Sequence, residues 1–228
     1  MRYTIYNMEH DPIAQKQYFE FAYQTGGDIW THIPYWELAA QMLPPHEKNA
    51  LVLDIGTGRG LLVTKLIEHG LKVIGIDYVE AIVNKANKDL VQEGYSDRAR
   101  IMQADVLDMP FAPLGFDMAT DVGTLQHLPA HKWRNYVDEL VRVLKPHAYY
   151  LNISLSRKTK SFLGWSPHTH ETGDFSKFGV HYHFFSGREI NHIFEDNFII
   201  IDQQFKSYNS HSDPRDDIAL VFTLMQKK

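Results

Sequence analysis

A glycine-rich turn beside an acid is the part of this sequence best suited to chemistry. A predicted buried strand runs into Asp54, and glycines follow at Gly56, Gly58 and Gly60. Glycines at a strand-to-helix turn let the backbone approach a ligand closely. In the dinucleotide-binding pattern the third glycine falls three residues after the second, but here it falls two after. An acid this close to the turn would repel a pyrophosphate, whereas it suits a cationic group such as an ammonium or sulfonium.

Two more acids follow the next two predicted strands. Asp77 ends the predicted strand 72–77, where it could accept hydrogen bonds from both hydroxyls of a ribose. Such charge-assisted bonds contribute about 1.5–3 kcal/mol each. Asp105 comes directly after the predicted strand 100–103 and could accept from an adenine amino group. Each acid taken singly could instead cap a helix, but three at equivalent places indicate a nucleoside site.

The elements that must position these acids alternate between strand and helix. This rhythm predicts an α/β fold with a seven-stranded, mostly parallel, doubly wound sheet and an antiparallel C-terminal hairpin. In such sheets ligands bind beyond the carboxyl ends of the strands. The predicted strands cover 50–54, 72–77, 100–103, 116–121, 148–155, 198–205 and 218–225.

Composition and charge exclude several classes of protein. The chain of 228 residues has no cysteine, which excludes thiolate metal sites and a covalent cysteine nucleophile. No stretch approaches the roughly 18 apolar residues of a membrane span, and the N-terminus lacks a signal-peptide pattern, so we expect a cytoplasmic protein. A formal charge of −5 gives no general attraction to nucleic acid, and the one basic run, 157–160, is short.

The motifs together resemble one known family. D-x-G-x-G-x-G at 54–60, GID at 75–77, ADV at 104–106, FDMATDVGTLQHL at 116–128 and LVRVLKP at 140–146 are similar to the class I S-adenosylmethionine-dependent methyltransferases. The resemblance covers about residues 50–155. It implies S-adenosylmethionine as methyl donor and S-adenosylhomocysteine as product. The cofactor-binding residues it implies are Asp54, Gly56, Thr57, Gly58, Gly60, Asp77, Tyr78, Asp105, Val106 and Asp121.

The family pattern also organises the chain as a single domain, 1–228. Residues 1–48 would be an N-terminal helical lid, 50–155 the cofactor-binding core, 156–185 an insertion on the acceptor side, and 186–228 the C-terminal helix and hairpin. The aromatic residues of 1–48 could form a lid over the acceptor pocket, or they could be the apolar face that packs on the sheet. These residues are Tyr18, Tyr23, Trp30 and Trp36. One departure concerns the turn after the fifth helix, where the family often has two glycines and this chain has His147 and Ala148.

The sequence says less about the acceptor side of the site. Holding the acceptor opposite the methyl group can supply much of the catalysis, so no strict catalytic motif is required there. If a base removes an acceptor proton, histidine is the usual residue. His127 follows the fourth strand on the expected face, and His181 and His183 are the other candidates. A histidine satisfied within the fold, or capping the following helix, is the plainer interpretation of His127.

The histidine-rich insertion is too polar for a core element and allows two interpretations. His-x-His in a strand places both imidazoles on one face, as a metal site would need. A wall of the acceptor pocket is the more ordinary role, and we predict no metal. The residues concerned are Trp165, His168, His170, Glu171, His181, Tyr182 and His183.

We therefore expect a methyltransferase acting on the oxygen or nitrogen of a small-molecule acceptor, with no nucleic-acid or membrane partner. An Asn/Asp-Pro-Pro-Tyr stretch, typical of adenine-amino DNA methylases, does not follow the fourth strand. Two alternatives remain: a non-catalytic S-adenosylmethionine-binding scaffold and, less favoured by the glycine spacing, a nicotinamide-dependent oxidoreductase. The acceptor and the oligomeric state stay open.

Overall fold

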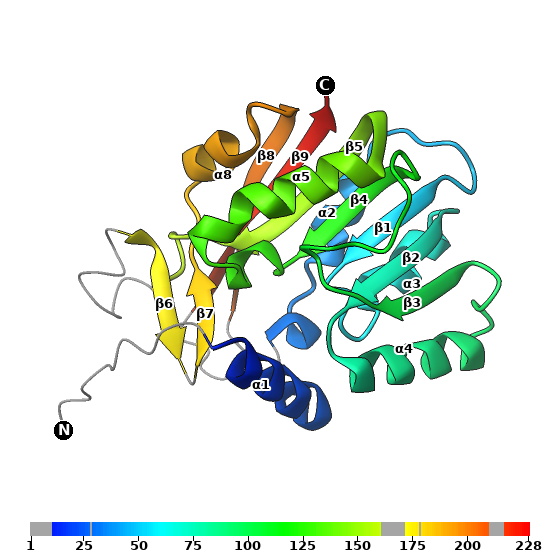
Figure 1. The fold of residues 1–228 in the computed structure, drawn as a ribbon, viewed down its shortest axis with the longest axis horizontal. Helices are drawn as coiled ribbons and strands as arrows, with labels where there is room; N and C mark the ends of the chain where they lie inside the picture. The colour runs from blue at the N-terminus through cyan, green and yellow to red at the C-terminus, as the bar shows by residue number, and fades with distance from the viewer. Residues whose placement is uncertain (1–10, 28, 161–171, 178, 210–216) are drawn as a thin grey trace.

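The structure is a computed structural model that describes residues 11–27, 29–160, 172–177, 179–209 and 217–228. Its strands and helices follow the predicted alternation (Figure 1). The helices are α1 (Pro12–Thr25), α2 (Trp36–Met42), α3 (Leu61–Glu68), α4 (Glu80–Gln92), α5 (Trp133–Val143) and α8 (Gly187–Phe194). The strands are β1 (Leu51–Ile55), β2 (Lys72–Asp77), β3 (Ala99–Gln103), β4 (Phe116–Val122), β5 (Leu144–Leu155), β6 (Asp174–Lys177), β7 (Val180–His183), β8 (Phe198–Asn209) and β9 (Asp217–Lys227).

The seven-stranded sheet has the order β3-β2-β1-β4-β5-β9-β8. Strands β3, β2, β1, β4 and β5 pair in parallel, and β9 lies antiparallel to both β5 and β8. The predicted fold class is therefore confirmed, C-terminal hairpin included. Strand β1 lies between β2 and β4, so Asp54 stands beside Gly75 of β2 and Thr120 of β4.

Helices cover both faces of the sheet. Apolar residues of α2, α3 and α4 pack on one face with Val52 and Val73, while those of α5 and α8 pack on the other with Leu53 and Ile55. This two-sided burial explains why β1 is almost uniformly apolar rather than alternating.

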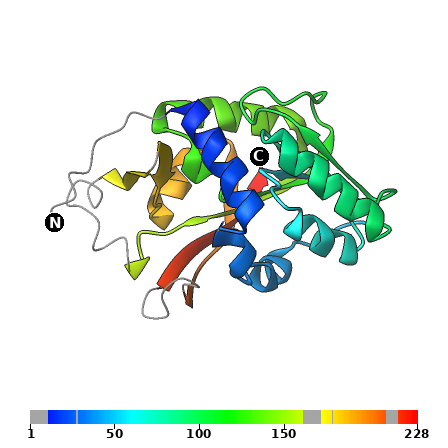
Figure 2. The ribbon, with the colours of Figure 1, turned by 90° about the horizontal axis from the view of Figure 1, so that it is seen from below.

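Helix α1 lies across one end of the sheet, between the β6–β7 hairpin and α4 (Figures 1 and 2). It begins with a side-chain cap: the Asp11 side chain accepts a hydrogen bond from the Ile13 amide at 2.9 Å, and Pro12 occupies the first turn. It ends at Gly26, which has a left-handed φ of 71°. Among the described helices, none is long and apolar enough to span a membrane.

The insertion 156–185 is more ordered than its polar composition predicts, where the structure describes it. It contains the hairpin β6–β7, with Val180, His183 and Phe185 each buried, so it does supply core residues. Polar side chains can be buried when they are paired, as His183 is with two carboxylates. Trp165, His168, His170 and Glu171 lie outside the described residues.

The C-terminal hairpin is longer than the sequence predicts. Strand β8 continues past Phe205 as far as Asn209, because the Tyr208 side chain is buried against the sheet's core.

His147 lies within β5, at the register shift in its pairing with β4, and has a left-handed φ of 60°, a conformation that favours glycine. Its side chain is exposed, so no packing compensates for the left-handed backbone. We expect His147→Gly to raise the free energy of unfolding by about 0.5–1 kcal/mol, the strain relieved less the extra entropy of an unfolded glycine. Urea unfolding measures it. The neighbouring Ala148→Gly, in buried strand, should destabilise instead, and a less stable His147→Gly would refute the argument.

Candidate active site

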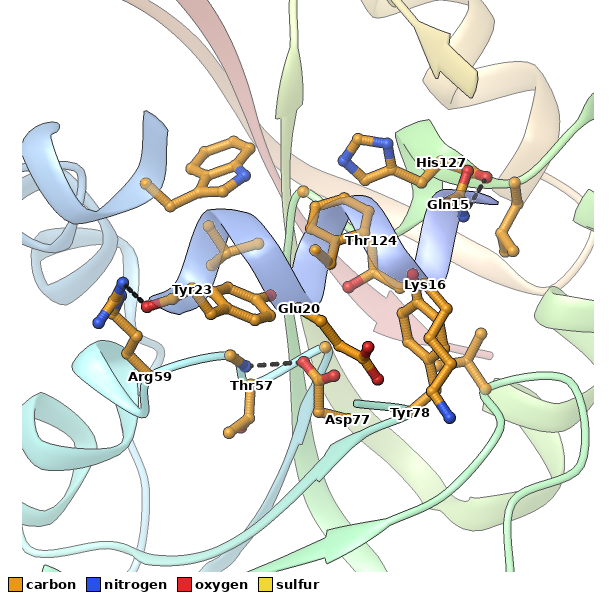
Figure 3. Close-up of a pocket in the computed structure, with 18 of the residues that line it drawn as sticks. Gln15, Lys16, Glu20, Tyr23, Thr57, Arg59, Asp77, Tyr78, Thr124 and His127 are labelled. Carbon is orange, nitrogen blue, oxygen red and sulfur yellow. Dashed lines mark hydrogen bonds between the residues drawn. The ribbon is translucent and has the colours of Figure 1, made fainter. Parts of the chain in front are cut away.

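A cavity of about 600 Å³ lies at the carboxyl ends of the central strands, with α1 across it (Figure 3). Its floor is the turn after β1 together with the ends of β2 and β4. Of the predicted cofactor residues, eight line it: Asp54, Gly56, Thr57, Gly58, Asp77, Tyr78, Asp105 and Val106. Gly60 and Asp121 do not line it.

The glycine turn is shaped by close contacts rather than by flexibility. Gly56 and Gly58 have φ values of 67° and 52°, in the left-handed region. A Cβ at Gly56 would lie 1.8 Å from the Thr124 hydroxyl oxygen, so no side chain fits there. A Cβ at Gly58 would stand 3.2 Å from the Tyr23 hydroxyl of α1, in the space of the cavity. The turn therefore leaves backbone, and not side chain, facing a ligand.

Asp54 is buried beneath this turn and held by two hydroxyls. Thr120 donates to its carboxylate at 2.6 Å, and Thr57 donates to the other oxygen. Gly75 makes room for this arrangement, since a Cβ there would meet the Thr57 hydroxyl at 2.5 Å. Burial raises the pKa of Asp54 to about 6, although both hydroxyls act to lower it. A buried carboxylate of this kind favours a cationic neighbour.

Asp77 is fixed at the end of β2 by backbone amides. Its two oxygens accept from Gly58 N at 3.0 Å and Val79 N at 2.9 Å, which ties the second acid to the glycine turn. Burial raises the pKa of Asp77 to about 6, and the backbone hydrogen bonds lower it in part. Each oxygen keeps a further lone pair for a ligand hydroxyl.

Asp105 completes the row of acids. It is exposed at the cavity edge, and its Oδ1 accepts from Leu107 N at 2.9 Å. The helix-cap alternative does not describe it, because no helix follows; the bond closes a turn between β3 and β4.

Asp121, which the family resemblance implies as a cofactor-binding residue, does not line the cavity. Its side chain points into the core, where Tyr136 and Tyr150 donate to it at 2.6 and 3.2 Å. The amides of Thr124 and Leu125 also donate to it, at 2.8 and 3.2 Å. Burial raises the pKa of Asp121. Asp121 thus shapes the turn that carries Thr124 and His127 to the cavity.

His127 lines the cavity, but both of its ring nitrogens lie against the protein. Nδ1 donates to the His181 carbonyl at 2.7 Å, which fixes the tautomer, and Nε2 lies 3.3 Å from the Gln126 amide nitrogen. The ring is wedged edge-to-face between Phe19 and Tyr182, with centroids 4.9 and 4.8 Å away.

The other two candidate histidines stand behind His127. His181 and His183 share one face of β7, as the His-x-His pattern predicts, and neither lines the cavity. His183 donates to Asp174 at 2.8 Å and Glu189 at 2.9 Å. Burial alone would lower the pKa of His183, but hydrogen bonds to these carboxylates raise it.

Of the four N-terminal aromatic residues, two lie at the cavity, as a lid would, and two pack against other parts of the protein. Tyr23 and Trp30 line the cavity, and Trp30 closes on Gly123, where a Cβ would meet the indole at 2.3 Å. Trp36 packs against the hydrophobic core, and Tyr18 contacts the Phe19 ring.

Several lining residues were missed from the sequence. Most are polar residues of α1, whose spacing on a half-exposed helix resembles any solvated face, while Arg59 lies in the glycine turn and Lys132 directly before α5. The main ones are Gln15, Lys16, Glu20, Arg59 and Lys132.

The proteins that this chain is similar to are described as methyltransferases. Residues 52–147 match the family model described as "Methyltransferase domain". The chain is 28% identical over 161 residues to EEF1A lysine methyltransferase 2 of Danio rerio, covering 61% of this chain and 67% of that protein. It is 27% identical over 145 residues to the ubiquinone biosynthesis O-methyltransferase of Paracidovorax citrulli, covering 57% and 60%. The matched stretches thus span about two thirds or less of these relatives.

A solved structure extends the likeness to the whole fold. The 1,6-didemethyltoxoflavin-N1-methyltransferase of Burkholderia thailandensis, solved with 1,6-didemethyltoxoflavin and S-adenosylhomocysteine bound, superposes with a TM-score of 0.75. It is 20% identical and covers 95% of this chain and 88% of its own. The chain thus has the fold of the class I S-adenosylmethionine-dependent methyltransferases, and its residues 52–147 match their methyltransferase domain.

The cavity fits the cofactor of this class. Its volume of about 600 Å³ is of the size that small-molecule sites have. Gly58 leaves open the space that a Cβ would fill, and three carboxylates, Asp54, Asp77 and Asp105, face a ligand that carries cationic groups, ribose hydroxyls and an amine.

Proposed function

We propose that this chain transfers the methyl group of S-adenosylmethionine to an oxygen or nitrogen atom of a small-molecule acceptor. The observation that carries the small-acceptor part is the position of α1 across the cavity, tethered on both sides. S-adenosylmethionine supplies an electrophilic methyl group; the protein's part is to bind, orient and exclude water.

The tethers of α1 come from the two walls of the cavity. On one side the Arg59 guanidinium donates to the Tyr23 carbonyl. On the other, Gln15 accepts from His181 N at 3.2 Å and donates to the His127 carbonyl at 3.5 Å. Helix α1, held near both of its ends, is the roof of the cavity. This roof leaves room for a compact acceptor beside Phe19 and His127, which favours a small molecule over a polypeptide chain.

The cofactor-binding roles follow from the geometry of the floor. Asp77 accepts from the ribose hydroxyls, and Asp54 favours the cationic end through its buried charge. Asp105 and Val106 stand at the other end of the cavity, where we place the adenine.

His127 forms part of the cavity wall and positions the acceptor. It does not act as a base, since its Nδ1 donates its proton to the His181 carbonyl and its Nε2 lies against the Gln126 amide. We expect His127→Ala to raise the acceptor KM about tenfold and to change kcat by less than about threefold, the signature of lost uniform binding. Steady-state kinetics over pH 5.5–8.5 measure both. If His127 were the base, kcat would fall 10²–10⁴-fold and its rise through pH 6–7 would flatten.

Labelled S-adenosylmethionine identifies the acceptor class. The protein is incubated with the donor and with two fractions of a cell extract, metabolites below about 1 kDa and proteins. We expect label in the metabolite fraction, and mass spectrometry then identifies the product. Label confined to polypeptides would overturn the small-molecule assignment, and no label in either fraction would favour the scaffold alternative.

A further inference from the structure

The hairpin β6–β7 gathers three metal-ligating side chains outside the methyl-transfer cavity. Asp174 pairs with His183 across the two strands, and His181 lies two residues before His183 on the same face. One ligand atom from each of the three lies within 4.8 Å of the others. The two imidazoles are buried, and the Asp174 side chain is 46% exposed, so the cluster is reached from solvent on one side.

The distances suit coordination of one ion. Asp174 Oδ1 lies 2.8 Å from His183 Nδ1 and 3.5 Å from His181 Nε2. Two ligands each at about 2.0–2.2 Å from a tetrahedral ion stand about 3.4 Å apart, so small side-chain adjustments would admit the ion.

The surroundings of His183 have the form found around metal-bound histidines. While Nδ1 faces the cluster, Nε2 donates to Glu189 Oε1 at 2.9 Å, and Arg157 holds the other oxygen of Glu189 at 2.9 Å. A carboxylate on the second ring nitrogen orients a ligand imidazole and raises its basicity. The Trp133 ring packs on His183 with centroids 4.8 Å apart and shields this side.

Against the expectation from the sequence that no metal binds, we propose that Asp174, His181 and His183 bind a divalent transition-metal ion such as Zn²⁺. Two imidazoles and one carboxylate are a donor set that such ions accept, with a further position left for water.

An ion here would fix the hairpin beside the methyl-transfer cavity. The His181 carbonyl accepts the Nδ1 proton of His127, and the Tyr182 ring packs against the same imidazole. The ion would therefore be a clamp that holds the wall of the cavity, and its binding does not depend on which acceptor the enzyme uses.

Zinc binding to the full-length, untagged protein tests the proposal. The chelator-treated protein is titrated with Zn²⁺ against a chromophoric chelator, the bound metal is counted by mass spectrometry, and thermal unfolding is followed with and without zinc. We expect one zinc per chain with a Kd below about 1 µM, and a higher unfolding temperature with zinc.

Matched variants assign the site. Asp174→Asn and His181→Ala should weaken binding at least tenfold, and Glu189→Gln about 10–100-fold by removing the negative charge of the group that accepts from His183. His192→Ala is the control, because His192 also pairs with a carboxylate, Glu195 at 2.8 Å, but lies on the surface. Zinc binding weaker than about 100 µM, or wild-type affinity in folded Asp174→Asn, would overturn the proposal.

Discussion

Gly58→Val is expected to abolish binding of both S-adenosylmethionine and S-adenosylhomocysteine, by roughly 100-fold or more in Kd. A Cβ at this position would already stand 3.2 Å from the Tyr23 hydroxyl, and the methyl groups of valine would extend into the cavity between the glycine turn and α1. Because the obstruction is steric, donor and product should be affected alike. Calorimetric titration with each ligand measures the loss.

Gly70→Val is the matched control for Gly58→Val. Gly70 also has a left-handed φ, 88°, but nothing lies within 4 Å of the position that a Cβ would take there, and Gly70 does not line the cavity. It should lose about 1–2 kcal/mol of stability through backbone strain while binding both ligands normally. If Gly58→Val kept its affinity within about threefold, the turn would be only a connection between β1 and α3.

Asp54→Asn should stabilise the free protein at pH 7.5 and weaken donor binding at least tenfold. Burial raises the pKa of Asp54 from 3.8 to about 6, so the ionised carboxylate is disfavoured in the folded state. Below pH 4 the protonated carboxyl group is buried without charge and the folded state keeps its full stability. As the pH rises through 6 the buried group ionises, and the free energy of unfolding falls by about 2–3 kcal/mol. Asparagine has no charge to bury and avoids that loss. The donor, however, loses its buried anionic neighbour.

Urea unfolding at pH 7.5 and pH 4 separates this effect from a change in packing. The gain of Asp54→Asn should be present at the higher pH and absent at the lower. Asp89→Asn is the control, since Asp89 makes an exposed pair with Lys85 at 2.6 Å and has no buried charge to relieve. Equal stability of Asp54→Asn and wild type at both pH values would contradict the proposed burial of charge.

The floor of the site could be predicted because its signals are local. Strand β1 is buried on both faces and reads as an apolar run, and the left-handed positions Gly56 and Gly58 require glycine. Asp54 and Asp77 each close a parallel strand, so the topology alone brings them to one edge of the sheet.

The roof and the hairpin could not be predicted, because they depend on contacts between distant parts of the chain. Gln15 reaches His181 across 166 positions, and nothing near Gln15 distinguishes it from a solvated helix residue. Asp121 resembles a ligand in the sequence because it lies near the end of β4, much as Asp77 ends β2. Its inward turn depends on Tyr136 and Tyr150, whose hydroxyls meet it only in the folded core.

Calorimetric titration of the 228-residue chain with S-adenosylmethionine tests the central claim most directly. We expect one binding site, a Kd that Asp77→Asn weakens about 10–100-fold through loss of the charge that we propose binds the ribose, and no binding of a nicotinamide dinucleotide at the same concentrations. A folded protein that fails to bind S-adenosylmethionine, or an Asp77→Asn variant with unchanged affinity, would contradict the account of this cavity.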